Sequence, residues 1–338
     1  MSSPHPFAGK PFKFGYTFSP NDIHDAFDPA LLIAHAQLAE SGRFDFIRFI
    51  ERPLSGDDTA ARTEPFTTAS FLATKTRRIG LIAQASTSYY EPFNLARLIA
   101  SLDHVTHGRA GWDIATGATR PAQINFSQAA RSAEAHNSRA IEVVEILRKL
   151  WDSWEAGAFV RNKETGEYVD GAKIHPIHHE GDLFRIKGPL NVARSPQGHA
   201  VVSQYIAAGD AIETSLALAV NEADLIILAA WPPVELRLVV DTLRSRLAEA
   251  GREALILADF TPESSNARSV VDRIEALVET ARLDGLNVRF GTSEGLSAYV
   301  AHVVPELQAR GLLADDYSGD TLRDHLGFAE PANRYAFA

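Results

Sequence analysis

The stretch from Gly108 to Phe126, GRAGWDIATGATRPAQINF, joins an apolar run to a polar one. Residues 110–116 have the length and composition of a buried strand, whereas the continuation contains glycine, proline, asparagine and glutamine, which are typical of a loop. The junction therefore places Trp112, Asp113 and Thr116 at or near the end of a predicted strand.

Seven further short apolar runs alternate with helical patterns along the chain, which is typical of parallel βα units. The eight predicted strands are 12–19, 44–50, 79–86, 110–116, 199–206, 223–230, 253–260 and 286–290. The helical patterns include 28–41, 63–76, 92–106, 134–155, 233–250, 265–282 and 293–310. This alternation predicts a (β/α)8 TIM barrel that forms a single domain over residues 1–338. A doubly wound open sheet is the alternative.

One long interval, residues 157–198, lacks this alternation and is rich in Gly, Lys, His and Pro. Its segment DLFRIKGP (182–189) could form only a short hairpin, so we expect an excursion on the top of the barrel rather than a second domain. The run HPIHH (175–179) resembles a metal cluster. However, the adjacent His178 and His179 would point opposite ways in an extended segment, and no carboxylate has suitable spacing. We expect hydrogen-bonded loop histidines and no metal site.

Composition narrows the class of partner. The 338 residues include 33 Lys plus Arg and 43 Asp plus Glu, and the net charge of −10 disfavours a nucleic acid or an anionic membrane surface as partner. The absence of cysteine excludes disulfides, thiolate metal ligands and cysteine nucleophiles, and it suits a reducing cytoplasm. No apolar stretch reaches the roughly 18 residues of a membrane span. We expect a cytoplasmic protein with a small-molecule substrate.

In a TIM barrel, functional side chains lie where strands end and the following loops begin. No lysine stands at these positions to form a Schiff base, and no HxH pair or acidic ladder suggests a metallohydrolase. Neither GxGxxG nor GxxxxGK[ST] occurs. The polar residues at the strand ends are Ser19, Asn21, His24, Glu51, Arg52, Ser86, Thr87, Ser88, Tyr89, Tyr90, Trp112, Asp113, Thr116, Asn125, Gln204 and Tyr205.

Three of these features have two interpretations each. Trp112 is either a core aromatic or a cofactor contact, and Asp113 favours the second because a buried carboxylate needs a partner. The uncharged run STSYY (86–90) suits a planar ligand with many hydrogen-bonding edges, or else a solvated loop. His24 is either an acid or hydrogen-bond donor on the substrate side, or a solvated histidine at a helix start.

The segment ASLDHVTHGRAGWDIATG (100–117) resembles the strand-4 signature of the bacterial luciferase-like flavin-dependent monooxygenases. It is most similar to the branch of nitrilotriacetate monooxygenase, long-chain alkane monooxygenase and dibenzothiophene-sulfone monooxygenase. Similar segments are ASTSYYEPFNLARLIASLDH (85–104), LRKLWDSWE (147–155), HHEGDLFRIKGPLNVARSPQGHAVV (178–202) and HVVPELQARGLLADDYSGDTLRDHLG (302–327). The resemblance covers almost the whole chain, and only residues 231–285 differ, being shorter than the long insertion usual there.

The resemblance implies a TIM barrel that takes reduced FMN from a separate NAD(P)H:flavin reductase and uses it with O2 to oxygenate a small organic substrate. The protein would hold the isoalloxazine ring in a dry pocket and aim it at the substrate. We also expect a homo-oligomer. The catalytic residues that we expect are His24 and Asp113. The implied cofactor-binding residues are Ser86, Thr87, Tyr89, Trp112, Asp113, Thr116, His136, Asn137, Gln204 and Gly209.

The sequence departs from this branch at the implied cofactor site. Asp113 replaces the usual Asn, Gly117 replaces a Ser, and Asn137 replaces a Tyr that helps to bind the FMN phosphate. The Gly- and Ser-rich phosphate turn has become YIAAGDAIETS (205–215), in which Asp210 and Glu213 oppose a dianion. Hydroxyl groups or positive charge could still come from Thr214, Ser215, Arg131, His136 and Arg139.

Two other functions remain open at this stage. One is a lyase or dehydrogenase on the same barrel that uses another flavin or a deazaflavin. The other is a non-catalytic relative that binds a flavin without turnover. A fold alone does not choose among such functions.

Overall fold

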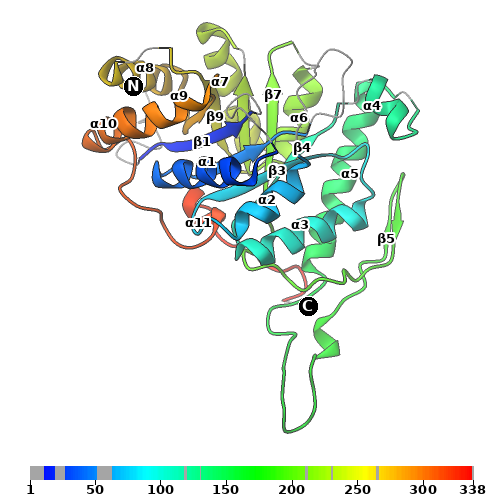
Figure 1. The fold of residues 1–338 in the computed structure, drawn as a ribbon. Coiled ribbons are helices and arrows are strands. Elements are labelled where there is room, and N and C mark those ends of the chain that lie inside the picture. Colours follow the sequence, from blue (N-terminus) through cyan, green and yellow to red (C-terminus); the bar gives the residue numbers. More distant parts are fainter. Residues whose placement is uncertain are drawn as a thin grey trace.

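A closed barrel of eight parallel strands forms the centre of the molecule (Figure 1). The computed structural model describes residues 11–19, 27–51, 63–117, 120–129, 131–209, 212–229, 231–263 and 266–336. Around the barrel the strands follow the order β1-β2-β3-β4-β7-β8-β9-β10, and β10 pairs in parallel with β1. This closure confirms the predicted TIM barrel and excludes the open sheet.

The eight predicted strands are all present. The barrel strands are β1 (Lys13–Phe18), β2 (Phe46–Phe49), β3 (Gly80–Ser86), β4 (Ala110–Ala115), β7 (Val201–Ala207), β8 (Leu225–Ala229), β9 (Leu255–Phe260) and β10 (Gly285–Val288). A separate antiparallel pair consists of β5 (His179–Glu180) and β6 (Arg185–Ile186).

Helices cover the outside of the barrel. They are α1 (Pro29–Ser41), α2 (Pro65–Ala73), α3 (Pro92–Thr106), α4 (Arg120–Asn125), α5 (Ala133–Asp152), α6 (Ile212–Glu222), α7 (Pro233–Glu249), α8 (Ala267–Ala281), α9 (Ser293–Ala298), α10 (Val304–Ala309) and α11 (Leu322–Leu326). A 3-10 turn, η2 (Gly171–Lys173), and a π-helical segment, η3 (Tyr299–Val303), complete the order, and η3 joins α9 to α10. The helices α4, α6 and α11 lie outside the helical patterns named from the sequence.

Alternation along each strand separates two cores, because successive side chains point to opposite faces of a sheet. The larger core lies between strands and helices and includes Trp112 and Ile114 of β4. The smaller core fills the amino end of the barrel's interior, where α11 closes it from below. Its residues are Phe46, Ile82, Val201, Leu225, Ile227, Leu255, Leu257, Leu322 and Leu326.

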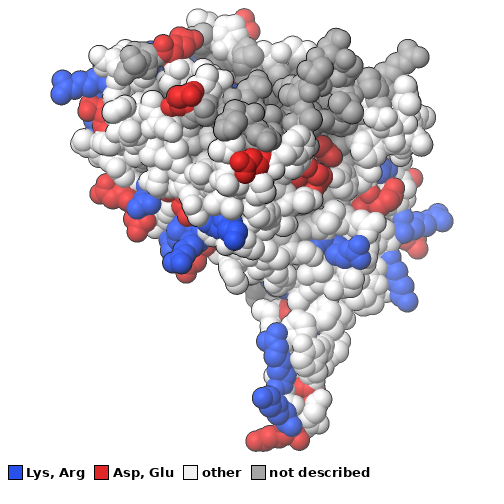
Figure 2. Space-filling model, in the orientation of Figure 1, with Lys and Arg blue, Asp and Glu red and all other residues white. Residues whose placement is uncertain are grey.

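The excursion after α5 begins at the amino end of the barrel strands, contrary to the expectation that it lies on the top, and only its β5–β6 hairpin returns along α5, where Phe184 contacts Arg139. Helices of a βα barrel return the chain to the amino ends of the strands, so an insertion between α5 and β7 starts there. The segment projects downward in Figure 1, and Figure 2 shows side chains of both charge signs toward its tip. It is stabilised by the bridges Trp154–Ile174 and Phe159–Val169, and by stacking of Trp154 on Phe159 at 5.4 Å.

The histidine-rich run belongs to this excursion. His175 Nε2 lies 2.6 Å from Glu155 Oε1, and the His175 ring stacks on Tyr335 with ring centroids 4.2 Å apart. His179 is buried, and its Nε2 lies 3.2 Å from Glu142 Oε1. In the part of the chain that the structure describes, no group of three or more His, Asp or Glu residues is placed to hold a metal. The same part contains no helix with the length and apolar character that a membrane span requires.

Candidate active site

The loop after β3 forms a hydrogen-bonded cluster with the start of α5 at the carboxyl end of the barrel. The Thr87 backbone N–H donates to Ala115 O at 3.0 Å, which fixes the loop against the end of β4. Ser88 Oγ lies 2.7 Å from His136 Nδ1, and Arg139 Nε donates to Thr87 O at 2.7 Å. The structure thus brings together Thr87 and His136, two of the expected cofactor-binding residues.

His136 is neutral near pH 7. Burial lowers its pKa, and the nearby positive charges of Arg131 and Arg139 lower it further. Arg139 is itself buried and directed at loop carbonyls, with its guanidinium 4.5 Å from the Phe184 ring centre. The third cationic candidate for a phosphate site, Arg131, is exposed and has no ion pair among the described residues.

Tyr89 presents an unsatisfied hydroxyl group beside this cluster. Its ring stacks on Phe126 with centroids 4.3 Å apart and planes 14° apart. Its hydroxyl oxygen is buried and has no hydrogen-bond partner among the described residues. A buried hydroxyl without a partner is costly, so a hydrogen bond from a ligand to this atom would be favourable.

Glu51 is the second residue after β2, and it contacts the end of β3 and the loop that follows. Its Oε2 accepts the Ser86 backbone N–H at 3.2 Å, and its Oε1 lies 3.4 Å from the Tyr90 hydroxyl. Burial raises the pKa of Glu51 to about 7, and the negative charge of Glu64 adds to the rise. A carboxyl group that changes charge near neutral pH at a barrel's carboxyl end is a candidate acid or base. The sequence marked Glu51 as a strand-end residue but gave it no role.

Asp113 is fully buried inside the barrel and is held by three side chains. Its Oδ2 accepts Arg48 Nε at 2.9 Å, Arg48 Nη2 at 2.7 Å and Gln84 Nε2 at 2.6 Å. Its Oδ1 accepts the Ser203 hydroxyl at 2.8 Å. The partner that a buried carboxylate needs is therefore Arg48, and not a cofactor. The structure offers no free oxygen of Asp113 for the catalytic role expected from the sequence.

Trp112 and Gln204 point away from the barrel's interior, contrary to their expected place in a cofactor pocket. Trp112 is fully buried in the helix-facing core, and its Nε1–H donates to Ala85 O at 3.2 Å. Gln204 Nε2 donates to Ser215 O in α6 at 3.2 Å. Both positions alternate with inward-facing neighbours, Asp113 and Ser203, which explains why they lie on the outer face.

The remaining expected residues are placed as follows. Thr116 is half-buried, and its carbonyl oxygen accepts the Ser88 hydroxyl at 3.3 Å. Asn137 is half-buried at the start of α5. Gly209 has a φ of +93°, a backbone conformation that residues with side chains rarely adopt. A Cβ added there would meet no atom within 4 Å. His24 lies outside the described residues.

The altered turn after β7 repels an anion less than its sequence suggested, because one of its two acidic residues is paired elsewhere. Glu213 is exposed and pairs with Arg246 Nη2 of α7 at 2.8 Å. This pairing directs its carboxylate toward the next helix of the barrel. The expectation that Glu213 opposes a phosphate group is therefore not supported, whereas Asp210 lies outside the described residues.

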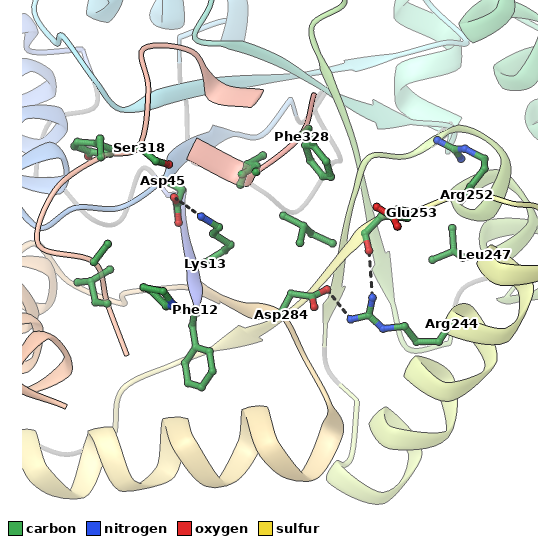
Figure 3. A pocket seen from close by; sticks show the side chains of 18 of the residues that line it. Phe12, Lys13, Asp45, Arg244, Leu247, Arg252, Glu253, Asp284, Ser318 and Phe328 are labelled. Carbon is green, nitrogen blue, oxygen red and sulfur yellow. Dashed lines mark hydrogen bonds and ion pairs between the residues drawn. The ribbon is translucent and has the colours of Figure 1, made fainter. Parts of the chain in front are cut away.

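A cavity of about 860 Å³ opens at the opposite, amino end of the barrel (Figure 3). Lys13 begins β1, and Asp45 and Asp284 immediately precede β2 and β10, so these lining residues mark that end. Four of its charged groups are paired: Lys13 Nζ lies 3.9 Å from Asp45 Oδ1, and Arg244 Nη2 lies 2.7 Å from Asp284 Oδ2. Active sites of TIM barrels lie at the other end, so we assign no catalytic role to this cavity.

Comparisons with known proteins identify the family to which the chain is similar. Residues 13–296 match the family model of the luciferase-like monooxygenases. The chain is 33% identical to N-acetyl-S-(2-succino)cysteine monooxygenase of Bacillus subtilis (strain 168), over 89% of this chain and 90% of that protein. It is 30% identical to nitrilotriacetate monooxygenase component A of Aminobacter aminovorans, over 81% and 80%. The crystal structure of a long-chain alkane monooxygenase superposes with a TM-score of 0.86 at 24% identity, covering 94% of this chain and 96% of that one.

These matches confirm the family inferred from the strand-4 signature and its neighbouring segments. The family model spans the barrel from β1 into α9, and both named relatives align over most of their own length. The chain belongs to the luciferase-like monooxygenase family and is an oxidoreductase of the flavin-dependent monooxygenase type.

Proposed function

We propose that this protein is the oxygenase of a two-component system, which receives reduced FMN from a separate NAD(P)H:flavin reductase and uses O2 to oxygenate a small organic substrate. The observation that carries the proposal is the family match over residues 13–296, which includes all eight barrel strands. The named substrates of the relatives range from nitrilotriacetate to long-chain alkanes, so they do not select a substrate for this chain.

The side chains at the carboxyl end fit a flavin. The end of β3 and the loop after it supply hydroxyl and backbone groups from Ser86, Thr87 and Ser88. The buried Tyr89 hydroxyl, which has no partner among the described residues, offers a further hydrogen bond. An isoalloxazine ring has several polar edges and a broad apolar face, and such a mixture of hydrogen-bonding and aromatic groups suits it. When bound, reduced FMN would supply the electrons that activate O2.

The chain's own residues would then position the ring, exclude water, and hold and donate one proton. The loop after β3 is held by Ala115 O and Arg139, so its polar groups are fixed before a ligand arrives. Glu51, with its pKa raised to about 7, can hold a proton at its carboxyl group in neutral solution. We infer that Glu51 donates this proton during the reaction, at the carboxyl end of the barrel.

Oxygen uptake in the presence of NAD(P)H, FMN and a flavin reductase tests the proposed function. Uptake that depends on this protein and yields an oxygenated compound supports it. Reduction of a deazaflavin without O2 would instead indicate a dehydrogenase. Tight flavin binding with neither reaction would indicate a non-catalytic relative.

The phosphate of FMN is expected to contribute little to binding. A phosphate dianion is normally held by backbone N–H groups and cations, but here His136 is neutral and Arg139 is directed at loop carbonyls. The purified protein should be colourless, bind oxidised FMN weakly and hold the reduced form better. Calorimetric titration should give affinities for FMN and riboflavin within about tenfold of each other, since a strong phosphate contact contributes more than that. Submicromolar binding of oxidised FMN without any binding of riboflavin would show that this expectation is wrong.

A further inference from the structure

A second polar cluster lies at the carboxyl ends of β7, β9 and β10. Asp259 accepts three side-chain donors: the Tyr205 hydroxyl at 2.8 Å, Asn287 Nδ2 at 2.6 Å and Arg289 Nη1 at 3.3 Å. Arg289 Nη1 also lies 3.3 Å from the Tyr205 hydroxyl. Arg48 Cζ lies 4.4 Å from the centre of the Tyr205 ring, so the cluster rests on the buried pair Arg48–Asp113.

The guanidinium of Arg289 is anchored on one side only. Its Nη1 makes both of its hydrogen bonds, while Nε and Nη2 have no partner among the described residues. The side chain of Arg289 is 37% exposed, whereas that of Asp259 is 11% exposed. The anchored edge is therefore held against Asp259 and Tyr205, and the partly exposed side chain leaves the other edge accessible to a ligand.

We propose that the Nε–Nη2 edge of Arg289 binds a carboxylate group of the substrate. Two parallel N–H groups on one edge of a planar guanidinium match the two oxygens of a carboxylate, and such bidentate, charge-assisted pairs are strong. The anchor on Asp259 and Tyr205 holds the side chain in place, so less conformational entropy is lost on binding. This inference rests on the proposed function and adds the class of substrate, an organic acid.

The position of Arg289 favours the substrate over the phosphate of FMN, the other oxyanion that could occupy it. In the order of the barrel strands, β9 and β10 lie opposite β3 and β4. The cluster that fits the flavin, Ser88 with His136 and the Tyr89 loop, is on the β3–β4 side. Arg289 therefore follows a strand on the opposite side of the barrel mouth from that cluster, and a substrate lying against the flavin would be on its side.

Ligand-detected NMR titration with succinate, and with uncharged succinamide as its control, tests the inference. The wild-type protein should bind succinate and not succinamide, in the presence or absence of FMN. Arg289→Met should weaken succinate binding by about tenfold or more, and Arg289→Lys, which keeps the charge without the two-pronged edge, should be intermediate. The control Arg237→Met removes an arginine of α7 that is 33% exposed and paired with Asp241, and it should change nothing.

Three results would overturn the assignment. Succinate binding that is absent from the wild type, or equal in Arg289→Met, shows that the edge does not recognise carboxylates. A loss of FMN affinity in Arg289→Met with riboflavin affinity unchanged assigns the edge to the phosphate. In each case normal reductase-coupled O2 uptake would leave the proposed function standing. Conversely, Arg289-dependent succinate binding by a protein without that uptake would support the carboxylate subsite and contradict the monooxygenase.

Discussion

Replacement of Asp113 by alanine is expected to destabilise the folded protein by about 3–5 kcal/mol, because it leaves the Arg48 guanidinium buried without its counter-charge. Arg48 is 1% exposed, and two of its nitrogens donate to Asp113 Oδ2. The substitution also removes the acceptors of Gln84 and Ser203. Thermal and urea unfolding of Asp113→Ala measure the loss.

The double variant Arg48→Met with Asp113→Asn separates the contribution of the ion pair to the free energy of unfolding from that of side-chain packing. It removes both charges together, and a buried pair replaced as a unit costs little, so its stability should lie within about 2 kcal/mol of the wild type. If the double variant were as unstable as Asp113→Ala, or if Asp113→Ala unfolded like the wild type, the pair would not have the role described.

Glu51→Gln is expected to lower kcat/KM for substrate oxygenation by about a hundredfold or more, the usual scale for loss of a general acid. Burial raises the pKa of Glu51 to about 7 by disfavouring the charged form, so the carboxyl group carries its proton below that pH. The kcat/KM of the wild type should therefore fall as the pH rises through about 7. The variant cannot give up a proton, so its profile should be low and flat across this range.

The exposed Glu213→Gln serves as the matched control and should keep the wild-type rate and pH profile, since its carboxylate pairs with Arg246 outside the barrel. A Glu51→Gln profile that still bends near pH 7 would assign the titration to another group. Full activity in Glu51→Gln would remove the proton-donating role altogether.

The barrel itself could be predicted because its strands are short apolar runs and its helices begin at Pro or a polar capping residue, as α1 does at Asp28 and Pro29. The sequence could also have predicted the face of the sheet to which each side chain points. Trp112 and Asp113 are neighbours on one strand and must point to opposite faces, so they could not both line a pocket. The prediction ignored this alternation and therefore placed Trp112 in the cofactor pocket, whereas it lies in the helix-facing core.

The partners inside the barrel could not be predicted, because they come from distant parts of the chain. Arg48 and Asp113 meet only because β2 and β4 both flank β3, and Arg289 meets Tyr205 only when the barrel closes. Local patterns contain no information on such pairings. The raised pKa of Glu51 has the same origin, since it depends on burial beside Ser86 and on the charge of Glu64.

Isotope labelling under 18O2 shows directly whether this protein transfers an oxygen atom from O2 to an organic acid. The protein, a flavin reductase, NAD(P)H and FMN are incubated with a panel of carboxylate-bearing amines and thioethers and their uncharged amide counterparts, and products are analysed by mass spectrometry. We expect one or more of the acids, and none of the amides, to gain a single labelled oxygen atom only when the protein is present. Recovery of all consumed oxygen as hydrogen peroxide across the panel, from a protein that binds reduced FMN, would contradict the oxygenation of organic acids by this protein.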